Sequence, residues 1–400
     1  MQALTPISEK ERIQVIDVIR GFAILGIFLV NMPDFNSPIM YLKPGSWSSE
    51  PLDRWTEIFI DIFAQASFYT LFSFLFGFGA MIFRERALMK GYSASWLFAR
   101  RLIVLFLIGC VHAFLIWHGD ILISYALTGA IFLLFYNAHE RYLLIGAAVF
   151  LLVPNTVISL LLLIPILIGE GDSAHFYNER LADEALQHYR DGTFSDIFWQ
   201  RWHDWVYVNG GAETIYIVIS LLPMFLLGAY AAKKQWFTAV EANEKILKRI
   251  SVFAFVIGII FKLLPYWSEK NVFTEYVQHT FGGPATAIFY AVTMALLSKN
   301  SLWNKLFSPL AAVGRMSLTN YLFQSIVCTV LFYSYGLGLY GSVRPFYGLL
   351  LTIAIYGLQL ALSTIWLSHY RMGPLEWIWR TLTYGQKQPF KKGETYERLL

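Results

Sequence analysis

Charged side chains are scarce in this sequence, and their scarcity excludes an ordinary water-soluble protein. Aspartate, glutamate, lysine and arginine together account for 14% of its 400 residues, whereas a water-soluble domain carries about 25%. The deficit runs from end to end and leaves no stretch for a large soluble domain. We therefore predict one membrane domain over residues 1–400.

Cysteine is also rare. The two cysteines, Cys110 and Cys328, both fall inside apolar stretches, so they provide neither a disulfide framework nor metal-ligand spacing. We predict buried thiols and no metal cofactor. The net charge of +4 is not gathered in a soluble basic segment with interleaved aromatic residues, which argues against nucleic acid as a partner.

Apolar residues, by contrast, make up 56% of the chain. A run of about 18 or more of them crosses the hydrocarbon core as a helix. We predict an all-α, polytopic integral membrane protein of about ten transmembrane helices, whose partner is the lipid bilayer. The expected spans are residues 14–32, 56–83, 102–117, 120–136, 142–168, 213–232, 249–267, 276–298, 311–335 and 345–368.

The lysines and arginines orient this arrangement. If the N-terminus lies inside, the inner segments hold about three times as many of them as the outer segments, and such basic loops stay cytoplasmic. Both termini are therefore predicted in the cytoplasm, with residues 369–400 as a cytoplasmic tail, and the protein is expected in the cell (plasma) membrane. Lys10 and Arg12 precede the first span as in a signal sequence, but no A-x-A cleavage site follows, so we expect an uncleaved first helix.

The longest loop, residues 170–212, is predicted outside the cell. Its second half spaces Trp199, Trp202 and Trp205 three residues apart, with charged residues between them. This pattern is typical of a short helix in the membrane interface, held there as an aromatic anchor.

Ionisable groups within a membrane span are functional candidates because they are costly to bury. In the first span, Asp17, Arg20 and Asn31 lie on one stripe about 60° wide, and Asn31 follows Arg20 by about 16 Å of helix. The alternative is an Asp17–Arg20 pair that reaches the inner interface, with Asn31 at a helix end.

A second group lies between the third and fourth spans, in the segment WHGDILISYALTG. His118 titrates near neutrality and is a candidate general base. Asp120 is a second candidate, although it is equally well placed to cap the following helix. His112, in the middle of a span, fits a satisfied interior group better.

A third group lies in the segment GRMSLTNYLFQS of the ninth span. Asn320 and Gln324 share a helix face, where hydrogen-bonded packing between helices explains them as readily as a binding site does. Arg315 lies near the cytoplasmic end, where a guanidinium binds phosphate with two hydrogen bonds.

Four motifs, in order along the chain, carry a resemblance to a known family. They are IDVIRGFAILGIFLVN, GDILISYALTG, AAVGRMSLTNYLFQS and GPLEWIWRTLTYG. Together they resemble the YeiB-like family of uncharacterised bacterial membrane proteins over nearly the whole chain. That family is similar in its first helices to membrane acyltransferases, including the acyltransferase-3 enzymes and heparan-α-glucosaminide N-acetyltransferase. The resemblance implies a helical core that carries acyl groups from cytoplasmic acyl-CoA to an acceptor across the membrane.

The resemblance extends to single residues of the first helix. In acyltransferase-3 enzymes a histidine follows an arginine in this helix; the arginine matches Arg20, and the histidine position holds Asn31. The glucosaminide acetyltransferase also has asparagine there, with its working histidine in the next loop. Residues 32–55 contain no histidine in this chain, so the general base has no counterpart in the pattern.

The expected activity is transfer of a small acyl group from acyl-CoA, the donor substrate, to a sugar or cell-envelope acceptor. The phosphates of CoA are expected near Arg20, Arg101 or Arg315. Asn31 is expected to donate a hydrogen bond to the developing oxyanion of the thioester.

His118 or Asp120 is expected to take the acceptor proton, and Asp17, Asn320 and Gln324 complete the predicted substrate-binding set. A transporter or lipid-handling protein without covalent chemistry is the alternative, because polar helices and a large outer loop suit it too. A structural or sensory membrane protein is a third. The motifs carry no information on the acceptor, the acyl group or the oligomeric state.

Overall fold

The computed structural model describes residues 12–43, 45–47, 50–169 and 177–394. Over these residues the chain is helical, as the sequence predicts, and its β-structure is limited to an isolated antiparallel bridge between Tyr370 and Lys391. Residues 170–176 of the predicted outer loop and residues 395–400 of the predicted tail lie outside the described part.

The elements follow one another in chain order. They are α1 (Gln14–Asn36), α2 (Pro51–Phe63), α3 (Ser67–Met89), α4 (Ala94–Val111), α5 (Leu122–Phe132), α6 (Glu140–Leu167), α7 (Glu179–Asp191), α8 (Phe194–Asn209), α9 (Ala212–Lys233), α10 (Glu244–Trp267), α11 (Val272–Val277), α12 (Gly283–Leu297), α13 (Ser301–Arg315), α14 (Ser317–Phe332), α15 (Pro345–His369) and α16 (Pro374–Tyr384), with short 3₁₀ helices at Ile39–Tyr41 and Leu133–Phe135 and π-helical segments at His112–Ile116 and Gln278–Gly282.

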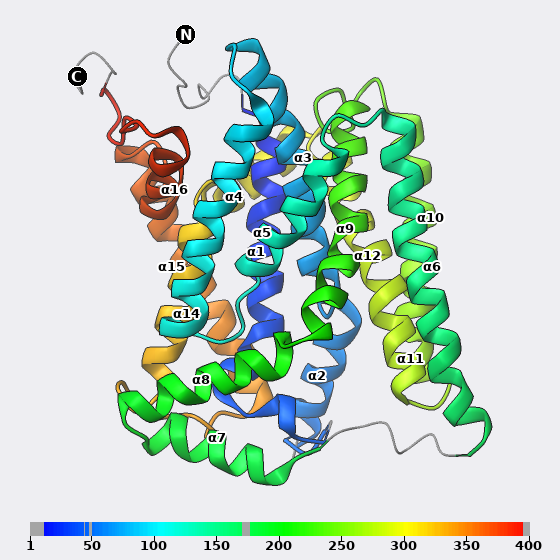
Figure 1. Ribbon diagram of the computed structural model, residues 1–400, viewed down its shortest axis with the longest axis vertical. Helices are drawn as coiled ribbons and strands as arrows, with labels where there is room; N and C mark the ends of the chain where they lie inside the picture. Colours follow the sequence, from blue (N-terminus) through cyan, green and yellow to red (C-terminus); the bar gives the residue numbers. More distant parts are fainter. Residues whose placement is uncertain (1–11, 44, 48–49, 170–176, 395–400) are drawn as a thin grey trace.

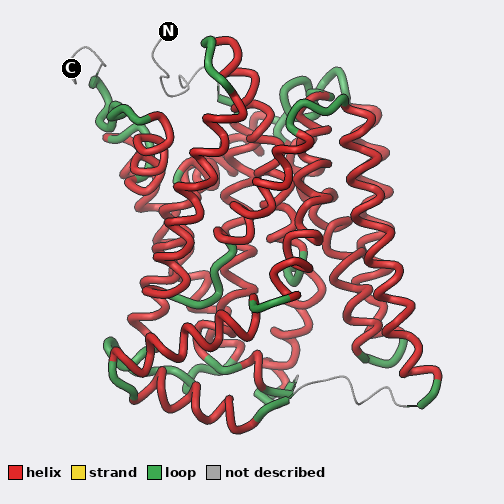
Figure 2. The backbone as a smooth tube through the Cα atoms, in the orientation of Figure 1, coloured by secondary structure: helices red, strands yellow, loops and turns green. Residues whose placement is uncertain are grey.

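Most of the long helices run along one axis of the molecule (Figure 1). The start of α1 and the whole of α16 lie at one end of this bundle, which we call the terminal end. Helices α7 and α8 lie across the opposite end, which we call the α7–α8 end. Loops gather at the two ends and leave the middle almost entirely helical (Figure 2).

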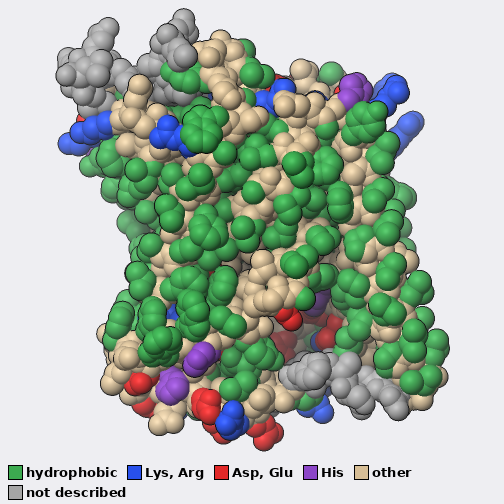
Figure 3. Space-filling model, in the orientation of Figure 1, with side chains coloured by type: hydrophobic (Ala, Val, Ile, Leu, Met, Phe, Trp, Pro, Cys, Tyr) green, Lys and Arg blue, Asp and Glu red, His purple; other side chains and the backbone are tan. Residues whose placement is uncertain are grey.

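The helices are built to lie in a membrane. Eight helical segments of the described chain are long and apolar enough to cross one by length and composition, and Leu122–Phe135 and Ser317–Phe332 are shorter apolar helices. The visible surface is apolar along its middle, with charged side chains near the two ends (Figure 3). The eight long segments are Gln14–Asn36, Pro51–Met89, Ala94–Ile116, Glu140–Leu167, Ala212–Lys233, Glu244–Trp267, Val272–Leu297 and Pro345–His369.

The predicted span 311–335 is two helices. The backbone leaves helical geometry at Met316, where α13 ends and α14 begins. The carboxylate of Glu376 in α16 accepts hydrogen bonds from the N–H groups of Leu318 (2.7 Å) and Thr319 (3.1 Å). A carboxylate satisfies the free N–H groups at a helix start and suits its positive dipole end. The break depends on this distant residue, so the local sequence does not reveal it.

The predicted span 56–83 is also broken, between α2 and α3. Ala66 there has φ 58°, a left-handed conformation that residues other than glycine rarely adopt. The buried Lys262 of α10 donates to the carbonyl oxygen of Asp61 (3.2 Å) and to that of Gln65. A cation at a helix C-terminus satisfies carbonyl groups that have no partner in the helix.

Helices α3 and α9 approach closely through glycine. A methyl group on Gly77 would overlap the backbone oxygen of Phe225, and one on Gly228 would overlap the backbone oxygen of Phe74. Small residues let helix backbones pack directly in a membrane, where van der Waals contact rather than the hydrophobic effect drives association. This contact fixes α3, which forms one wall of the cavity described below.

Replacing Gly77 or Gly228 by alanine is expected to lower the free energy of unfolding by about 1–3 kcal/mol, because the added methyl group forces the two backbones apart. Gly357 is the matched control, since a methyl group there meets nothing within 4 Å. Gly357→Ala is expected to be neutral or slightly stabilising. Thermal unfolding of the purified variants in detergent measures the difference, and equal melting temperatures for all three variants would contradict this packing.

Candidate functional site

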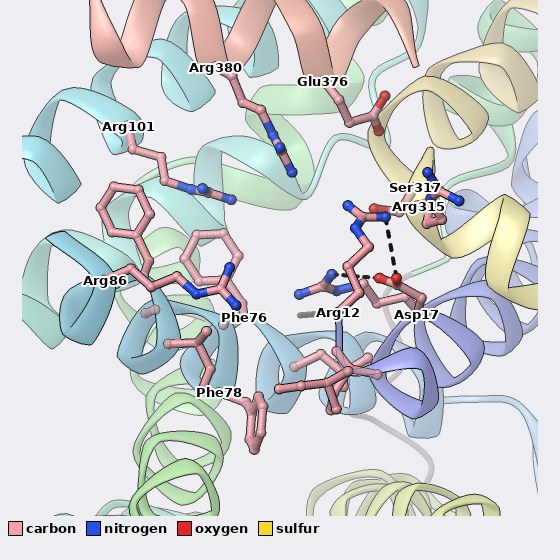
Figure 4. Close-up of a pocket in the computed structure, with 18 of the residues that line it drawn as sticks. Arg12, Asp17, Phe76, Phe78, Arg86, Arg101, Arg315, Ser317, Glu376 and Arg380 are labelled. Atoms are coloured by element: carbon pink, nitrogen blue, oxygen red, sulfur yellow. Dashed lines mark hydrogen bonds and ion pairs between the residues drawn. The ribbon is translucent and has the colours of Figure 1, made fainter. Parts of the chain in front are cut away.

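A cavity of about 470 Å³ opens at the terminal end. Side chains from α1, α3, α4, α13 and α16 surround it, and Arg12, Arg86, Arg101 and Arg380 extend toward a common space (Figure 4). One part of the lining is aromatic and aliphatic. The charged lining residues are Arg12, Asp17, Arg20, Arg86, Lys90, Arg101, Arg315, Glu376 and Arg380.

Positive charge exceeds negative charge in this lining. Asp17 accepts hydrogen bonds from both Arg12 (3.5 Å) and Arg20 (3.3 Å), so one carboxylate serves two guanidinium groups. Glu376 is occupied at the start of α14. Burial lowers the pKa of Arg12 to about 10, which leaves this side chain charged at neutral pH. The cavity is therefore suited to an anion.

Arg101 is held by aromatic rings. Its guanidinium carbon lies 3.9 Å from the ring centre of Trp379 and 5.3 Å from that of Phe83. Such cation–π contacts position a guanidinium without neutralising its charge. The indole N–H of Trp379 also donates to the carbonyl oxygen of Arg101 (2.9 Å), which ties α16 to α4 in the cavity lining.

The structure brings together four of the predicted site residues here: Asp17, Arg20, Arg101 and Arg315 all line the cavity. Asn320 and Gln324 lie elsewhere. The Asn320 amide donates to the hydroxyl of Ser363 (3.0 Å), and the Gln324 amide donates to Gln359 (2.9 Å). These contacts join α14 to α15. Hydrogen-bonded packing between helices is one of the two interpretations that the sequence allows for these residues.

His118 lies in a second polar cluster, at the α7–α8 end. Its Nε2 is 3.2 Å from a carboxylate oxygen of Asp34, and its Nδ1 is 3.7 Å from one of Asp204. The hydroxyl of Tyr189 donates to Asp204 (2.6 Å) and lies 3.3 Å from His118 Nδ1. His118 and Asp204 are almost completely buried, whereas the Asp34 side chain is 24% exposed. Asp34 is thus the accessible edge of the cluster.

Helix α8 does more than anchor the chain in an interface. Trp199 is 55% exposed, as an interfacial aromatic residue would be, but Arg201 and Asp204 are buried on the opposite side. Asp204 also accepts hydrogen bonds from Tyr41 (2.7 Å) and Gln200 (2.7 Å). The charged residues between the tryptophans therefore face the protein.

Several buried donors near this cluster have no hydrogen-bond partner within the described part of the chain. They are the indole N–H of Trp117, one terminal nitrogen of Arg201 and the hydroxyl of Tyr333. The rings of Trp117 and His118 are 5.6 Å apart, and Tyr333 stacks on Tyr189 at 4.4 Å. Buried donors in this condition are sites for water or for a hydroxyl-bearing ligand.

Asp120 belongs to a third, separate group. One carboxylate oxygen accepts a hydrogen bond from the N–H of Ile123 (2.8 Å) at the start of α5. Asp120 therefore caps this helix, as one of its two interpretations from the sequence predicts. The other carboxylate oxygen lies 2.8 Å from Nδ1 of His112, whose Nε2 lies 2.8 Å from the hydroxyl of Ser325. His112 is a satisfied interior group, as expected, yet it is satisfied by a carboxylate and a serine.

Asn31 is half-buried in α1, and its side chain makes no hydrogen bond to another described residue. It lies one turn before Asp34 on the same helix. Sequence reasoning missed Asp34, although the polar stripe of α1 extends to it at i, i+3. It also missed Tyr189 and Asp204 as companions of His118, because no local pattern links α7 and α8 to that histidine.

Three relatives that match this chain over nearly their whole length show which family it belongs to. "Uncharacterized protein YxaH" of Bacillus subtilis (strain 168) is 40% identical over 411 residues, which covers 98% of this chain and 99% of the relative. "Uncharacterized protein YeiB" of Escherichia coli (strain K12) is 30% identical over 400 residues, covering 93% and 96%. The chain belongs to the YeiB-like family. "Uncharacterized 39.9 kDa protein in amylase 3'region" of Bacillus acidopullulyticus is also similar, with 31% identity over 388 residues and 96% and 98% coverage.

One region of this YeiB-like chain also matches a family by its own description. "Protein of unknown function (DUF418)" matches residues 231–386, which begin near the end of α9 and end just after α16. The match includes Arg315, Glu376 and Arg380 of the cavity, whereas Asp17 and Arg20 precede it. The cavity is therefore assembled from both the DUF418 region and the part of the chain before it.

The charge of His118 is linked to the stability of the fold. Burial by itself lowers the pKa of His118, but the facing carboxylates of Asp34 and Asp204 outweigh burial and raise this pKa above its ordinary value of about 6.5. A raised pKa means that the folded state holds the proton more tightly than the unfolded chain does. The resulting stabilisation is complete below about pH 6.5 and is lost as the pH rises through the raised pKa.

His118→Gln is expected to remove this part of the pH dependence. The melting temperature of the wild type should fall as the pH rises from about 6.5, and that of the variant should fall less. His203→Gln is the matched control, because His203 lies on the exposed side of α8. Melting temperatures measured in detergent across this pH range test the linkage, and superimposable profiles for wild type and His118→Gln would disprove it.

Proposed function

We propose that this protein is a membrane acyltransferase that moves a small acyl group from cytoplasmic acyl-CoA to a sugar or cell-envelope acceptor. The observation that carries the proposal is the arginine-rich cavity at the terminal end. The excess of lysine and arginine on the inner segments favours a cytoplasmic location for this end. Acyl-CoA would then reach the cavity from the side on which it is made.

The lining of the cavity matches the chemistry of CoA. Guanidinium groups bind phosphate with two parallel hydrogen bonds, and Arg20, Arg101 and Arg315 line the cavity from three different helices. The aromatic wall, which includes Phe76 and Phe83, suits the less polar arm that ends in the thioester. A ligand with phosphates at one end and an acyl chain at the other fits a cavity that has guanidinium groups on one part of its lining and aromatic rings on another.

The cluster at the α7–α8 end suits the acceptor. The unpaired donors of Trp117, Arg201 and Tyr333 match the oxygen atoms of a hydroxyl-rich molecule. Helix α1 connects the two ends, since Asn31 lies about 16 Å beyond Arg20. The proposed reaction forms a bond between an acceptor atom and the acyl carbon, breaks the C–S bond and releases CoA as the thiol.

Three kinds of residue take part in the proposed reaction. Arginines of the cavity hold the donor, and Asn31 donates a hydrogen bond to the oxyanion that develops at the thioester carbonyl. His118, or Asp120 through His112, takes the proton of the acceptor. The bilayer around them excludes water and protects the thioester from hydrolysis.

Arg20→Ala, Arg101→Ala and Arg315→Ala are each expected to raise the Kd for CoA by about tenfold or more, since each removes a charged hydrogen bond worth roughly 1.5–3 kcal/mol. Calorimetry with CoA and acetyl-CoA on the detergent-purified protein measures this. Arg141→Ala is the control, because Arg141 is an exposed residue of α6 away from the cavity. Well-folded wild-type protein with no affinity for these or longer acyl-CoAs would favour a transporter or lipid-handling role instead.

Asn31→Ala is expected to slow acyl transfer by about 10²–10³-fold while CoA binding stays within about twofold, because an oxyanion contact acts in the transition state. The rate is followed as CoA thiol released from acetyl-CoA by proteoliposomes supplied with a cell-envelope extract. The control is Asn243→Ala, whose side chain bonds backbone carbonyls in the loop before α10. Equal loss of binding and of rate in Asn31→Ala would show that Asn31 acts in donor binding or folding.

A further inference from the structure

Ser325, His112 and Asp120 form a hydrogen-bonded group that is next to the His118 cluster but is not part of it, and none of the three lines the cavity. The hydroxyl of Ser325 is 2.8 Å from His112 Nε2, and His112 Nδ1 is 2.8 Å from a carboxylate oxygen of Asp120. All three side chains are buried. They come from three elements: α14, the π-helical segment after α4, and the loop before α5.

One neutral tautomer of His112 gives every hydrogen bond in this group a donor and an acceptor. An ionised carboxylate only accepts, so Nδ1 of a neutral His112 carries the proton that faces Asp120. Nε2 is then an acceptor 2.8 Å from the Ser325 hydroxyl, nearer than the other acceptor of that hydroxyl, the carbonyl oxygen of Tyr321 at 3.4 Å. A hydroxyl on a base that is itself oriented by a third group is the arrangement of an activated nucleophile. The Gln324–Gln359 pair, by contrast, joins two helices and contains neither a nucleophile nor a base.

The position of Ser325 along α14 agrees with a role in transfer. Ser317, at the start of this helix, lines the cavity, and Ser325 lies about 12 Å further along. Tyr333, at the other end of the helix, stacks on Tyr189 in the outer cluster, about 12 Å beyond Ser325. Ser325 thus lies midway between the proposed donor and acceptor ends.

The neighbourhood of His112 is also unusual for simple packing. The helix widens into a π-helical segment at His112–Ile116, and such segments occur frequently at functional sites. Trp117 lies between the two histidines, with its ring 6.2 Å from that of His112 and 5.6 Å from that of His118. The serine group and the acceptor cluster are therefore adjacent.

We infer that Ser325 is a covalent acyl carrier, so that the acyl group crosses the protein in two shorter steps. This inference rests on the proposed function. In the first step the Ser325 oxygen bonds to the thioester carbonyl carbon, its proton passes to His112 Nε2, and the C–S bond breaks. The departing sulfur takes that proton and leaves as the CoA thiol.

The second step restores the enzyme. An acceptor hydroxyl or amine bonds to the carbonyl carbon of the acyl-serine, and its proton passes to His112 Nε2. As the bond between the Ser325 oxygen and the acyl carbon breaks, the proton moves to Ser325. Asp120 keeps the imidazole in one orientation throughout and stabilises its charged form. The complete burial of Ser325 protects the ester from water between the two steps.

The test uses the full chain in detergent, mixed with radiolabelled acetyl-, succinyl- or palmitoyl-CoA and no added acceptor. The expected result is a burst of CoA thiol of about one per protein and an acyl ester on the peptide that contains Ser325. Ser325→Ala and His112→Gln should lose the burst and the label, on the order of a hundredfold or more, while they still bind acyl-CoA. Ser325→Cys should recover a label as a thioester.

Ser159→Ala is the matched control, because Ser159 is a buried serine of α6 that only bonds the backbone of Asn155. Its burst and label should equal those of the wild type. A hydrophobic fluorophosphonate provides a second readout that needs no acyl-CoA: the Ser325 oxygen bonds to phosphorus, fluoride leaves and His112 takes the proton. Wild type and Ser159→Ala should react at Ser325, and His112→Gln should not.

The possible outcomes separate the two proposals. If acyl-CoA binds but wild type gives neither burst nor label, transfer is direct, and the acyl carrier is disproved while the acyltransferase proposal stands. If no acyl-CoA binds, the acyltransferase proposal fails, and reaction of Ser325 with the fluorophosphonate decides whether it is an activated nucleophile. If Ser325 also fails to react with the fluorophosphonate, the group of Ser325, His112 and Asp120 only packs helices together.

Discussion

The close contact between α1 and α13 is the constraint on which the sites depend. A methyl group on Gly314 would overlap the backbone oxygen of Asp17, and one on Gly21 would overlap the backbone oxygen of Leu310. Two glycines therefore set the two backbones in direct contact over about one turn. Arg20 and Arg315, which are next to these contacts in the two helices, both line the cavity. The contact between α1 and α13 also fixes the point from which α14 starts toward the opposite end.

Breaks in the helices also shape the architecture. In hydrocarbon every free backbone group needs a partner within the protein, and here charged side chains of distant helices provide it. Glu376 satisfies the start of α14, and Lys262 satisfies the end of α2. The break at Met316 places Arg315 in the cavity lining and starts a new helix that carries Ser325 away from it. The helix breaks thus set the positions of several candidate site residues.

The two ends of the bundle differ in charge. Guanidinium groups dominate the cavity at the terminal end, whereas His118 at the α7–α8 end lies near Asp34, Asp204 and the hydroxyl of Tyr189. An anion is favoured at the first end, and a hydroxyl-bearing molecule fits the second. This polarity is the physical basis for proposing a reaction that runs from one side of the membrane to the other. Helices α1 and α14 both extend between the two ends.

Composition and local pattern were sufficient to predict a helical membrane protein and much of the cavity. Apolar runs must form helices in hydrocarbon, because only a helix satisfies its own backbone. Charges within such runs are costly wherever they lie, so Asp17, Arg20 and Arg315 stood out without any partner being known. The stripe on α1 is a property of one helix, and its period is visible in the sequence.

Only the tertiary structure decided which of these groups meet. His118 and Asp120 are two residues apart, yet His118 pairs with Asp34 and Asp204, whereas Asp120 pairs with His112 and, through it, Ser325. Asn320 and Gln324 share a helix face that the sequence assigns equally to a site or to packing, and in the structure their side chains join α14 to α15. These outcomes depend on which helix faces pack together, a property of the whole bundle. A sequence shows that a buried charge needs a partner, but the partner comes from a distant helix that only the packing identifies.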